Sequence, residues 1–353
     1  MDKKIIQAVA GSGKTTYIIN ALNLEKRFLI ITYTDNNYSI IKNSIIKKYG
    51  FLPENIEVYT FFTFLYNFAI KPQENGIKGI NYWRKSNGID FKTLSKDLAH
   101  GLSSRQDSYY MNKRLEYYHF RMSKLILERP NMIRFLKERL EKHFDYIYID
   151  ESQDLASYDF DLLLKMSSFN VHILVLGDFY QHTFDTSNDG NKNKGLYDDF
   201  EKYKKRFKSF YEFDETSLEK SYRCSQNLCE YVENKLGITM KSHGNRHTDI
   251  REIVNDEEII KIVQDANIVK LFYRNHKNFS GVNSDNWGNS KGSTFENVCV
   301  VINKKTYKEY ASDKLTTLNP QTLRKFYVAV TRTKNSLFFI EEEKLKKLNF
   351  FEN

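Results

Sequence analysis

The chain has 353 residues, of which 41% are hydrophobic and 28% charged, and this composition excludes a largely disordered or collagen-like protein. Lysine and arginine exceed aspartate and glutamate by 54 to 45, and the net charge of +9 favours a polyanionic partner such as nucleic acid. The sequence has no apolar run of the roughly 18 residues that span a bilayer, no apolar secretory signal at its start and only three cysteines. We therefore expect a cytoplasmic protein with no membrane partner and no disulfide framework.

Short apolar runs alternate with amphipathic stretches, a pattern that predicts strands joined by helices and therefore parallel sheets. In chain order the predicted elements are strand 5–10, helix 15–24, strand 28–34, helix 39–49, strand 56–60, helix 124–143, strand 146–150, helix 158–166, strand 172–177, helix 226–236, helix 257–263, strand 267–273, strand 298–302, helix 321–331 and strand 337–340. The predicted fold class is α/β.

The alternating series is interrupted by a polar, loop-like stretch at 187–194 and resumes after about residue 210. This organisation predicts two α/β domains, residues 1–210 and residues 211–353. Residues 71–125 show no strand pattern and are expected to form a small helical insertion in the first domain.

A phosphate-binding loop is predicted at residues 10–16, AGSGKTT, because the segment follows an apolar strand and precedes a helix. Glycines let the backbone N–H groups converge on a phosphate, Lys14 would reach the β- and γ-phosphates of ATP, and the Thr15 hydroxyl would hold Mg²⁺. The usual pattern begins with a glycine where this chain has Gln7. The expected nucleotide-binding residues of the loop are Gly11, Ser12, Gly13, Lys14, Thr15 and Thr16.

A second motif follows the apolar run 146–149, which ends in the acidic sequence DESQD. A carboxylate at the carboxyl end of a strand beside a phosphate loop can hold Mg²⁺, and this is the role expected for Asp150. The next carboxylate, Glu151, can orient and deprotonate a water for in-line attack on the γ-phosphate.

Three further side chains are candidates for contacts with the γ-phosphate. Gln181 follows the apolar strand 172–177 and either reports the presence of that phosphate or is an ordinary surface residue. Arg223, in the sequence SYR, and Arg332, in AVTR, could supply the cations that phosphoryl transfer needs. An exposed, ion-paired arginine is the alternative reading of each.

Taken together, the segments AGSGKTT, TYT, TFFTF, DESQD, GDFYQ, SYR, KGSTFENV and YVAVTR resemble, in order, motifs I to VI of superfamily 1 helicases of the UvrD/Rep type. The resemblance extends over residues 10–332, nearly the whole chain. It implies two RecA-like domains that close over ATP and single-stranded DNA, and a DNA helicase that moves 3′ to 5′.

The resemblance also implies roles for individual residues. Tyr222 would stack on the adenine, while Gln181, Arg223 and Arg332 would contact the γ-phosphate. Aromatic and hydroxyl side chains suit sequence-independent strand binding, although an aromatic such as Phe61 can equally be a core residue. The expected strand contacts are Thr32, Tyr33, Thr60, Phe61 and Thr294.

The main departure from the family concerns size. Full helicases of this type carry a large accessory domain between a strand like 267–273 and motif V, whereas only residues 275–290 separate Arg274 from Lys291 here. The chain is therefore expected to be a minimal ATPase that translocates on single-stranded DNA, or on a duplex with an overhang, in DNA repair or anti-phage defence. The alternative is a nucleotide-gated, nucleic-acid-binding subunit that controls a partner such as a nuclease, and RNA is a further alternative as the polymer.

Overall fold

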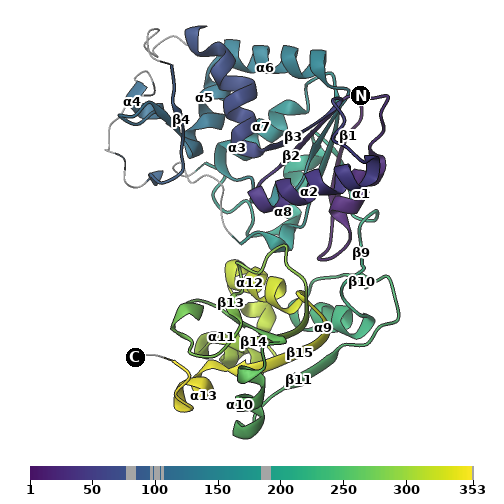
Figure 1. Ribbon diagram of the computed structural model, residues 1–353, viewed down its shortest axis with the longest axis vertical. Helices are drawn as coiled ribbons and strands as arrows, with labels where there is room; N and C mark the ends of the chain where they lie inside the picture. The colour runs from purple at the N-terminus through teal and green to yellow at the C-terminus, as the bar shows by residue number, and fades with distance from the viewer. Residues whose placement is uncertain (77–84, 96–97, 99–103, 105–106, 184–191, 352–353) are drawn as a thin grey trace. The chain divides into compact units, whose positions relative to one another are not determined.

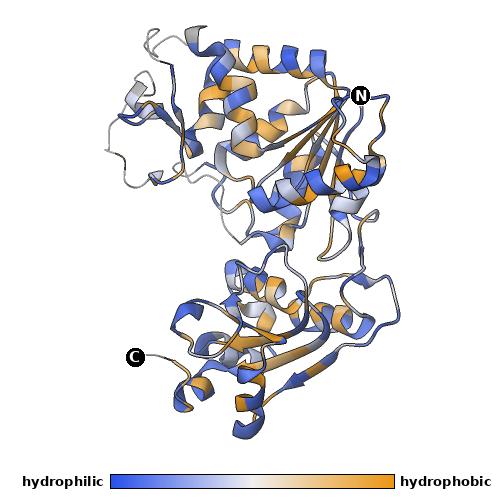
Figure 2. Ribbon diagram, viewed as in Figure 1, coloured by the Kyte–Doolittle hydropathy of each residue, from blue (hydrophilic) through white to orange (hydrophobic). Residues whose placement is uncertain are grey.

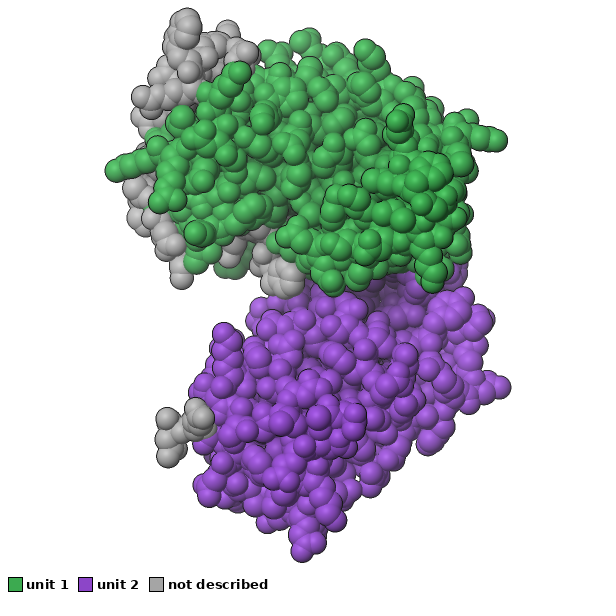
Figure 3. Space-filling view, viewed as in Figure 1, with its two compact units in different colours: residues 1–6, 15–177, 184–214 green, residues 7–14, 178–183, 215–353 purple. Residues whose placement is uncertain are grey.

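The computed structural model describes residues 1–76, 85–95, 98, 104, 107–183 and 192–351. The chain forms two compact units (Figures 1 and 3). Unit 1 comprises residues 1–6, 15–177 and 184–214, and unit 2 comprises residues 7–14, 178–183 and 215–353. Two short segments, 7–14 and 178–183, therefore belong to unit 2 by their packing, although the chain on both sides of each belongs to unit 1.

Unit 1 is built on a six-stranded sheet with the order β3-β2-β6-β7-β1-β8. The pairs β2–β3, β2–β6, β6–β7 and β1–β8 are parallel. Every residue of β2 is buried, as expected for a strand that is covered on both faces. The strands are β1 (Lys3–Gln7), β2 (Phe28–Thr32), β3 (Ile56–Thr60), β6 (Tyr146–Ile149), β7 (His172–Gly177) and β8 (Glu212–Asp214).

The principal helices around this sheet begin and end at residues that explain their limits. The Thr34 hydroxyl caps the start of α2 by accepting a hydrogen bond from Asn37 N (3.1 Å), and the helix ends at Gly50, which has a φ of +83°. The predicted helix 124–143 is two helices, because Pro130 lacks an N–H and begins the second of them. The helices are α1 (Lys14–Ala21), α2 (Asp35–Tyr49), α3 (Phe61–Phe64), α4 (Asp107–Tyr110), α5 (Met122–Glu128), α6 (Pro130–His143), α7 (Ser157–Met166) and α8 (Phe200–Lys208).

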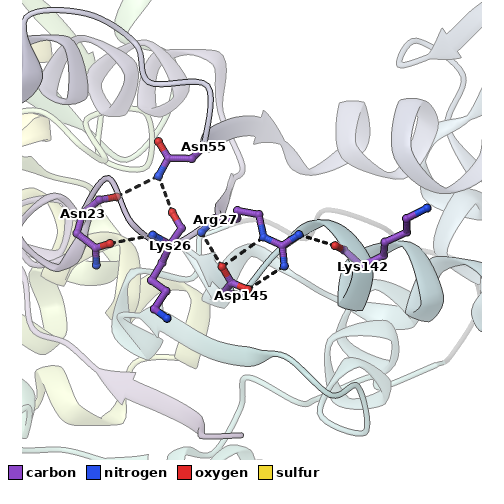
Figure 4. A network of polar contacts seen from close by, with 6 residues as sticks. All are labelled: Asn23, Lys26, Arg27, Asn55, Lys142 and Asp145. Carbon is purple, nitrogen blue, oxygen red and sulfur yellow. Dashed lines mark hydrogen bonds and ion pairs between the residues drawn. The ribbon is translucent and has the colours of Figure 1, made fainter.

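An ion pair joins the amino ends of β2 and β6 (Figure 4). Arg27 directly precedes β2 and Asp145 directly precedes β6. The Asp145 carboxylate accepts hydrogen bonds from Arg27 N (2.8 Å), Nε (3.3 Å) and Nη2 (2.8 Å), and these bonds lower the pKa of Asp145. Since both side chains are partly exposed, the pair contributes at most about 1 kcal/mol, and its main effect is on the alignment of the strands.

The insertion at 71–125 is only partly helical, contrary to the prediction. Two strands, β4 (Gly88–Asp90) and β5 (Glu116–Tyr118), pair in parallel within it. Each has three residues, too few to produce the alternating pattern by which a strand is recognised in a sequence. Residues 77–84, 96–97, 99–103 and 105–106 of the insertion lie outside the described residues, as do residues 187–191 of the predicted loop at 187–194.

Unit 2 has a five-stranded parallel sheet with the order β11-β15-β14-β12-β13. Alternate residues of β14 point to opposite faces: Val298 and Val300 pack in one apolar cluster with α9 and α12, and Cys299 packs in the other with α10 and α13. The strands are β9 (Lys220–Ser221), β10 (Lys241–Ser242), β11 (Asp249–Glu252), β12 (Ile268–Phe272), β13 (Ser284–Asn286), β14 (Phe295–Ile302) and β15 (Thr333–Glu341). The helices are α9 (Gln226–Leu236), α10 (Asp256–Gln264), α11 (Lys304–Ala311), α12 (Pro320–Val330) and α13 (Glu342–Lys347).

The predicted α/β class, with parallel sheets flanked by helices, is confirmed and is consistent with RecA-like domains. Figure 2 shows the central strands of both sheets as mostly hydrophobic, whereas a surface helix such as α6 alternates between hydrophobic and hydrophilic turns. Among the described residues, none of the helices combines the length and the apolar character that a bilayer crossing needs.

Residues 275–290, the segment that takes the place of an accessory domain, pack on the sheet of unit 2. Part of the segment forms the edge strand β13, and Trp287 follows it. The Trp287 ring is fully buried, lies against Tyr273 and Phe326, and donates a hydrogen bond from Nε1 to Leu271 O (2.8 Å). The segment is thus anchored by one large aromatic side chain.

Replacing Trp287 with phenylalanine should lower the free energy of unfolding by about 1–3 kcal/mol, because the Leu271 carbonyl loses its side-chain donor and the smaller ring leaves a gap. Urea unfolding followed by circular dichroism measures the change. Val282→Ala is the matched control in the same segment, since the Val282 side chain is exposed, and it should stay within about 0.5 kcal/mol of the wild type. Equal stability of Trp287→Phe and the wild type would contradict the anchoring role.

Candidate active site

The residues predicted to act on a nucleotide are divided between the two units. The phosphate loop up to Lys14 belongs to unit 2, together with Gln181, Tyr222, Arg223 and Arg332. The rest of the predicted set belongs to unit 1: Thr15, Thr16, Asp150 and Glu151. Each set is described within its own unit.

The phosphate loop is held in unit 2 through its backbone. The Ser221 hydroxyl donates a hydrogen bond to Ala10 O (2.7 Å), and Tyr222 N donates one to Gly11 O (2.9 Å). Gly11 has a φ of +72°, and a Cβ at this position would lie 2.6 Å from the Cβ of Arg223. Only glycine satisfies both the backbone angle and the close approach, so the sequence SYR packs directly against the loop.

The Gln7 side chain, which departs from the usual loop pattern, also binds within unit 2. Its Oε1 accepts a hydrogen bond from Phe179 N (3.3 Å), and its Nε2 donates one to Ala8 O (3.0 Å). The Gln7 side chain therefore links the start of the loop to segment 178–183. Within the loop, Ser12 is buried, and its hydroxyl has no hydrogen-bond partner among the described residues.

A chain of hydrogen bonds connects segment 178–183 to Arg332. Gln181 Nε2 donates to Asp178 Oδ2 (2.7 Å), and Arg332 Nη2 donates to Gln181 Oε1 (3.3 Å). Gln181 is 4% exposed, so the alternative of an ordinary surface residue does not apply. Two residues predicted to contact the γ-phosphate are thus brought together, and the function of Gln181 as a phosphate sensor remains a prediction.

Tyr327 links the phosphate loop to the same chain of hydrogen bonds. Its hydroxyl accepts a hydrogen bond from Ala10 N (3.0 Å) and donates one to Asp178 Oδ2 (3.1 Å). The side chain lies on α12, is fully buried, and precedes Arg332 by a little more than one helical turn. A shift of α12 would therefore disturb the hydrogen bonds that Tyr327 makes with the loop backbone and with Asp178.

Two arginines place positive charge in the interior of unit 2. Burial lowers the pKa of Arg332 to about 9, with a further contribution from the charge of Arg223, and burial also lowers the pKa of Arg223. Their hydrogen bonds go to neutral oxygens: Arg332 binds Val328 O (2.8 Å) and Gln181 Oε1 (3.3 Å), and Arg223 binds Thr331 O (3.0 Å). Arg332 is fully buried and Arg223 is half-buried, and two neighbouring cations that repel each other form a site that a bound anion would stabilise.

The carboxylate that counters these charges is that of Asp178, which is fully buried. Burial raises the pKa of Asp178, while the charge of Lys14 and hydrogen bonds from Gln181 and Tyr327 oppose the rise. Asp178 is thus the acidic group that lies beside the two arginines in unit 2, held by hydrogen bonds from Gln181 and Tyr327.

Tyr222 presents an exposed ring beside the phosphate loop. The ring is 61% exposed and stacks on His243, with 4.1 Å between the ring centroids and 26° between the planes. The short parallel pair β9–β10 aligns Ser221 with Ser242 and so brings the two rings together. An exposed, pre-positioned aromatic pair is suited to stacking on a purine.

In unit 1, Asp150 and Glu151 follow the carboxyl end of β6. Asp150 is buried, its N–H donates a hydrogen bond to Ile31 O (2.8 Å), and its Oδ1 accepts one from Glu151 N (2.9 Å). Glu151 has a φ of +56° and a ψ of +40°, a left-handed conformation that is uncommon outside glycine. Its carboxylate accepts a hydrogen bond from Gln153 Nε2. Strained backbone of this kind is concentrated at functional sites, which agrees with the predicted role of Glu151.

The predicted strand contacts of unit 1 also lie at carboxyl ends of strands. Parallel pairing places Thr32 directly opposite Thr60, and Tyr33 contacts the ring of Phe62 (6.0 Å between centroids). Thr32 and Phe61 are buried, at 1% and 5% exposure, which favours a core position for these two side chains. The fifth predicted contact, Thr294, is exposed and lies in unit 2.

A comparison with models of protein families shows which family the chain belongs to. Residues 100–341, more than half of the chain, match the viral superfamily 1 RNA helicase core domain. The chain belongs to this family. The match establishes the superfamily 1 helicase that the motif order predicted, while the resemblance to the UvrD/Rep type is a finer statement that it does not address. A comparison with curated proteins found no match.

Solved structures similar to this helicase core include three of arterivirus helicases. A structure of the PRRSV helicase is 13% identical (TM-score 0.46), and the match covers 99% of this chain and 54% of that one. Two structures of Arterivirus nonstructural protein 10, one in complex with DNA, are 11% and 12% identical, with TM-scores of 0.49 and 0.48. These matches again cover 99% of this chain, and 62% and 63% of the others. The chain thus spans a little more than half of the length of the helicases it matches.

A superfamily 1 helicase core uses a nucleotide and a divalent metal, and the residues present fit Mg²⁺. Mg²⁺ takes oxygen ligands and is usually held by one or two carboxylates together with phosphates and water. No group of three or more His, Cys, Asp or Glu side chains among the described residues could hold a metal ion without such phosphates. The buried Asp150 carboxylate and the Thr15 hydroxyl, both in unit 1, would hold the ion, which when bound would neutralise phosphate charge.

Sequence reasoning assigned no role to three residues of this helicase core that the structure places at the site. Asp178 and Tyr327 lie inside quoted motifs, GDFYQ and YVAVTR, so their proximity to Gln181 and Arg332 was the available signal. His243 lies outside every motif, and nothing in the sequence pointed to it.

Tyr327→Phe should reduce kcat/KM for ATP hydrolysis by about 10- to 100-fold, because the change removes the acceptor for Ala10 N–H and the hydroxyl donor to a buried carboxylate. Steady-state kinetics measures the loss. Tyr307→Phe is the matched control, since it removes another tyrosine–carboxylate hydrogen bond, to Glu252 (2.8 Å), at an exposed position in unit 2. If both variants kept wild-type kinetics, Tyr327 would have no part in positioning the loop.

Proposed function

We propose that the chain is an ATP-driven motor, a translocase or helicase that acts on single-stranded DNA in the 3′ to 5′ direction. The observation that carries this proposal is the arrangement within unit 2. Arg332 binds Gln181 at 3.3 Å, and Arg223 packs against Gly11 of the phosphate loop, so the two cations and the loop occupy one region. Positive charge beside a phosphate loop is what the binding of a nucleoside triphosphate requires.

The roles in hydrolysis follow from the chemistry of the side chains. Water attacks the γ-phosphorus of ATP, the bond from this phosphorus to the β–γ bridging oxygen breaks, and ADP leaves with that oxygen. The Glu151 carboxylate accepts the proton that the water loses. Negative charge on the phosphate oxygens is stabilised by Lys14, Arg223 and Arg332. Gln181, bound to Asp178 on one side and Arg332 on the other, would respond to the phosphate through both.

Glu151→Gln should lower kcat for ATP hydrolysis by at least about 100-fold, because the amide cannot accept the proton, while the affinity for ATP stays within about threefold. Phosphate release measures hydrolysis, and a fluorescent ATP analogue measures binding. Glu138→Gln makes the same change at an exposed position on α6 and should leave both unchanged. A Glu151→Gln variant with wild-type turnover would assign the base to another residue.

A second experiment can decide whether the nucleic acid on which the chain acts is DNA or RNA. The motif order resembles that of UvrD/Rep-type DNA helicases, whereas the matched family is described as an RNA helicase core, so RNA is the second candidate. Single-stranded DNA should raise the rate of ATP hydrolysis above the rate measured without nucleic acid. Duplex DNA without an overhang should stimulate it less.

Hydrolysis measured with single-stranded DNA, duplex DNA and single-stranded RNA separates these possibilities. Greater stimulation by RNA than by DNA would replace DNA with RNA as the substrate. If ATP is bound but no nucleic acid stimulates its hydrolysis, the motor proposal is wrong. The chain would then be better described as a nucleotide-gated subunit for a partner such as a nuclease in DNA repair or anti-phage defence.

A further inference from the structure

The insertion of unit 1 presents an exposed aromatic ring that no motif accounts for. Phe91 is 56% exposed and lies directly after β4, and its ring stacks on that of His119, which lies directly after β5. The centroids are 5.5 Å apart, and the planes differ by 24°. The stack follows from the sheet register, because Asp90 is paired with Tyr118 and the next residues of the two strands are Phe91 and His119.

The backbone around Phe91 is held by the Asp90 side chain. Its oxygens accept hydrogen bonds from Lys92 N (2.8 Å), Thr93 N (3.0 Å), Thr93 Oγ1 (2.7 Å) and Asn112 Nδ2 (2.9 Å). Burial would raise the pKa of Asp90, but these bonds outweigh it and hold the pKa well below its usual range. His119 Nδ1 also lies 3.0 Å from Asp90 O. Both residues of the stack are therefore fixed in place before any ligand binds.

The stack continues into the region predicted to bind the strand. The Phe62 ring lies against both Phe91 (5.7 Å) and His119 (5.3 Å). On its other side Phe62 contacts Phe61 (5.4 Å) and Tyr33 (6.0 Å), two of the predicted strand contacts. Phe61 and Phe62 are each only 5% exposed, so within this aromatic cluster the large surface that a base could reach belongs to Phe91.

A single exposed phenylalanine on a protein surface needs no explanation. Phe91 differs in that its ring is stacked on a second ring, its turn is locked by a satisfied carboxylate, and its neighbours lead to the predicted strand path. Lys92, which follows it, is also exposed and adds positive charge for a phosphate. Every nucleobase has an aromatic face, so a fixed ring of this kind binds single strands without regard to sequence.

We propose that Phe91, supported by His119, is a stacking platform for a base of single-stranded nucleic acid. This proposal rests on the proposed function and extends the predicted strand path from the segments TYT and TFFTF to the insertion. It predicts that Phe91→Ala weakens the binding of a labelled oligodeoxythymidine by about 5- to 150-fold, the loss expected for one base–aromatic contact.

Fluorescence anisotropy of the labelled strand measures the dissociation constant. Phe51→Ala is the matched control, because Phe51 is a phenylalanine of unit 1 with nearly the same exposure, 57%, and it should bind as the wild type does. Phe91→Leu keeps an apolar side chain without an aromatic face and should behave like Phe91→Ala. Phe91→Trp should bind as tightly as the wild type, and its added tryptophan fluorescence should be quenched when the strand is bound. Thermal melting verifies that each variant is folded.

The outcomes separate the two proposals. If the wild type binds the strand and Phe91→Ala binds equally well, or Phe91→Trp shows no added quenching, the platform is overturned and the motor proposal stands. Equal losses in Phe91→Ala and Phe51→Ala would also overturn the platform. A wild-type chain that binds no single strand would overturn both.

Discussion

The buried hydroxyl of Tyr327 is the contact on which the rest of the nucleotide site depends. The hydroxyl accepts a hydrogen bond from the Ala10 N–H of the phosphate loop and donates one to a carboxylate oxygen of Asp178. Asp178 in turn binds Gln181, and Gln181 binds Arg332. Because a buried polar group that loses its partner is costly, the loop, segment 178–183 and helix α12 are held in one mutual arrangement. The two arginines are held in a low-dielectric environment by the same arrangement, and there their charge acts strongly on an anion.

The limits of several strands and helices could be predicted from the sequence, because the hydrophobic pattern and the residues that end each element agreed with one another. Strands β3 and β7 and helix α9 have the predicted limits. Helix α9 is an amphipathic stretch whose ends are set by the N-cap Ser225 and by Gly237. Parallel strands place their carboxyl ends at one edge, so residues that follow apolar runs could be expected to lie at that edge. The motif order further suggested that Gln181 and Arg332 belong together, and the structure brings them within 3.3 Å.

Other features of the fold and of the site could not be predicted from the sequence, for physical reasons. The pairs β4–β5 and β9–β10 have two or three residues per strand, and such strands are specified by their partners rather than by their own pattern. The role of Tyr327 depends on the backbone N–H of Ala10 and the side chain of Asp178, and no local pattern encodes the proximity of these three positions. One error was avoidable: Pro130 lies inside the predicted helix 124–143, and proline in a helix interior is a sufficient reason to expect two helices.

The exchange of short segments between the units has a consequence for how this chain can be divided. The polypeptide passes from one unit to the other after Ile6, Lys14, Gly177, Thr183 and Asp214. A fragment cut at residue 214 would therefore contain the second sheet but lack residues 7–14 and 178–183, which complete its packing. Such a cut would also separate the phosphate loop from Ser221 of β9 and Tyr327 of α12, to which its backbone is hydrogen-bonded. The boundary between the units therefore cannot be drawn by a single cut in the chain.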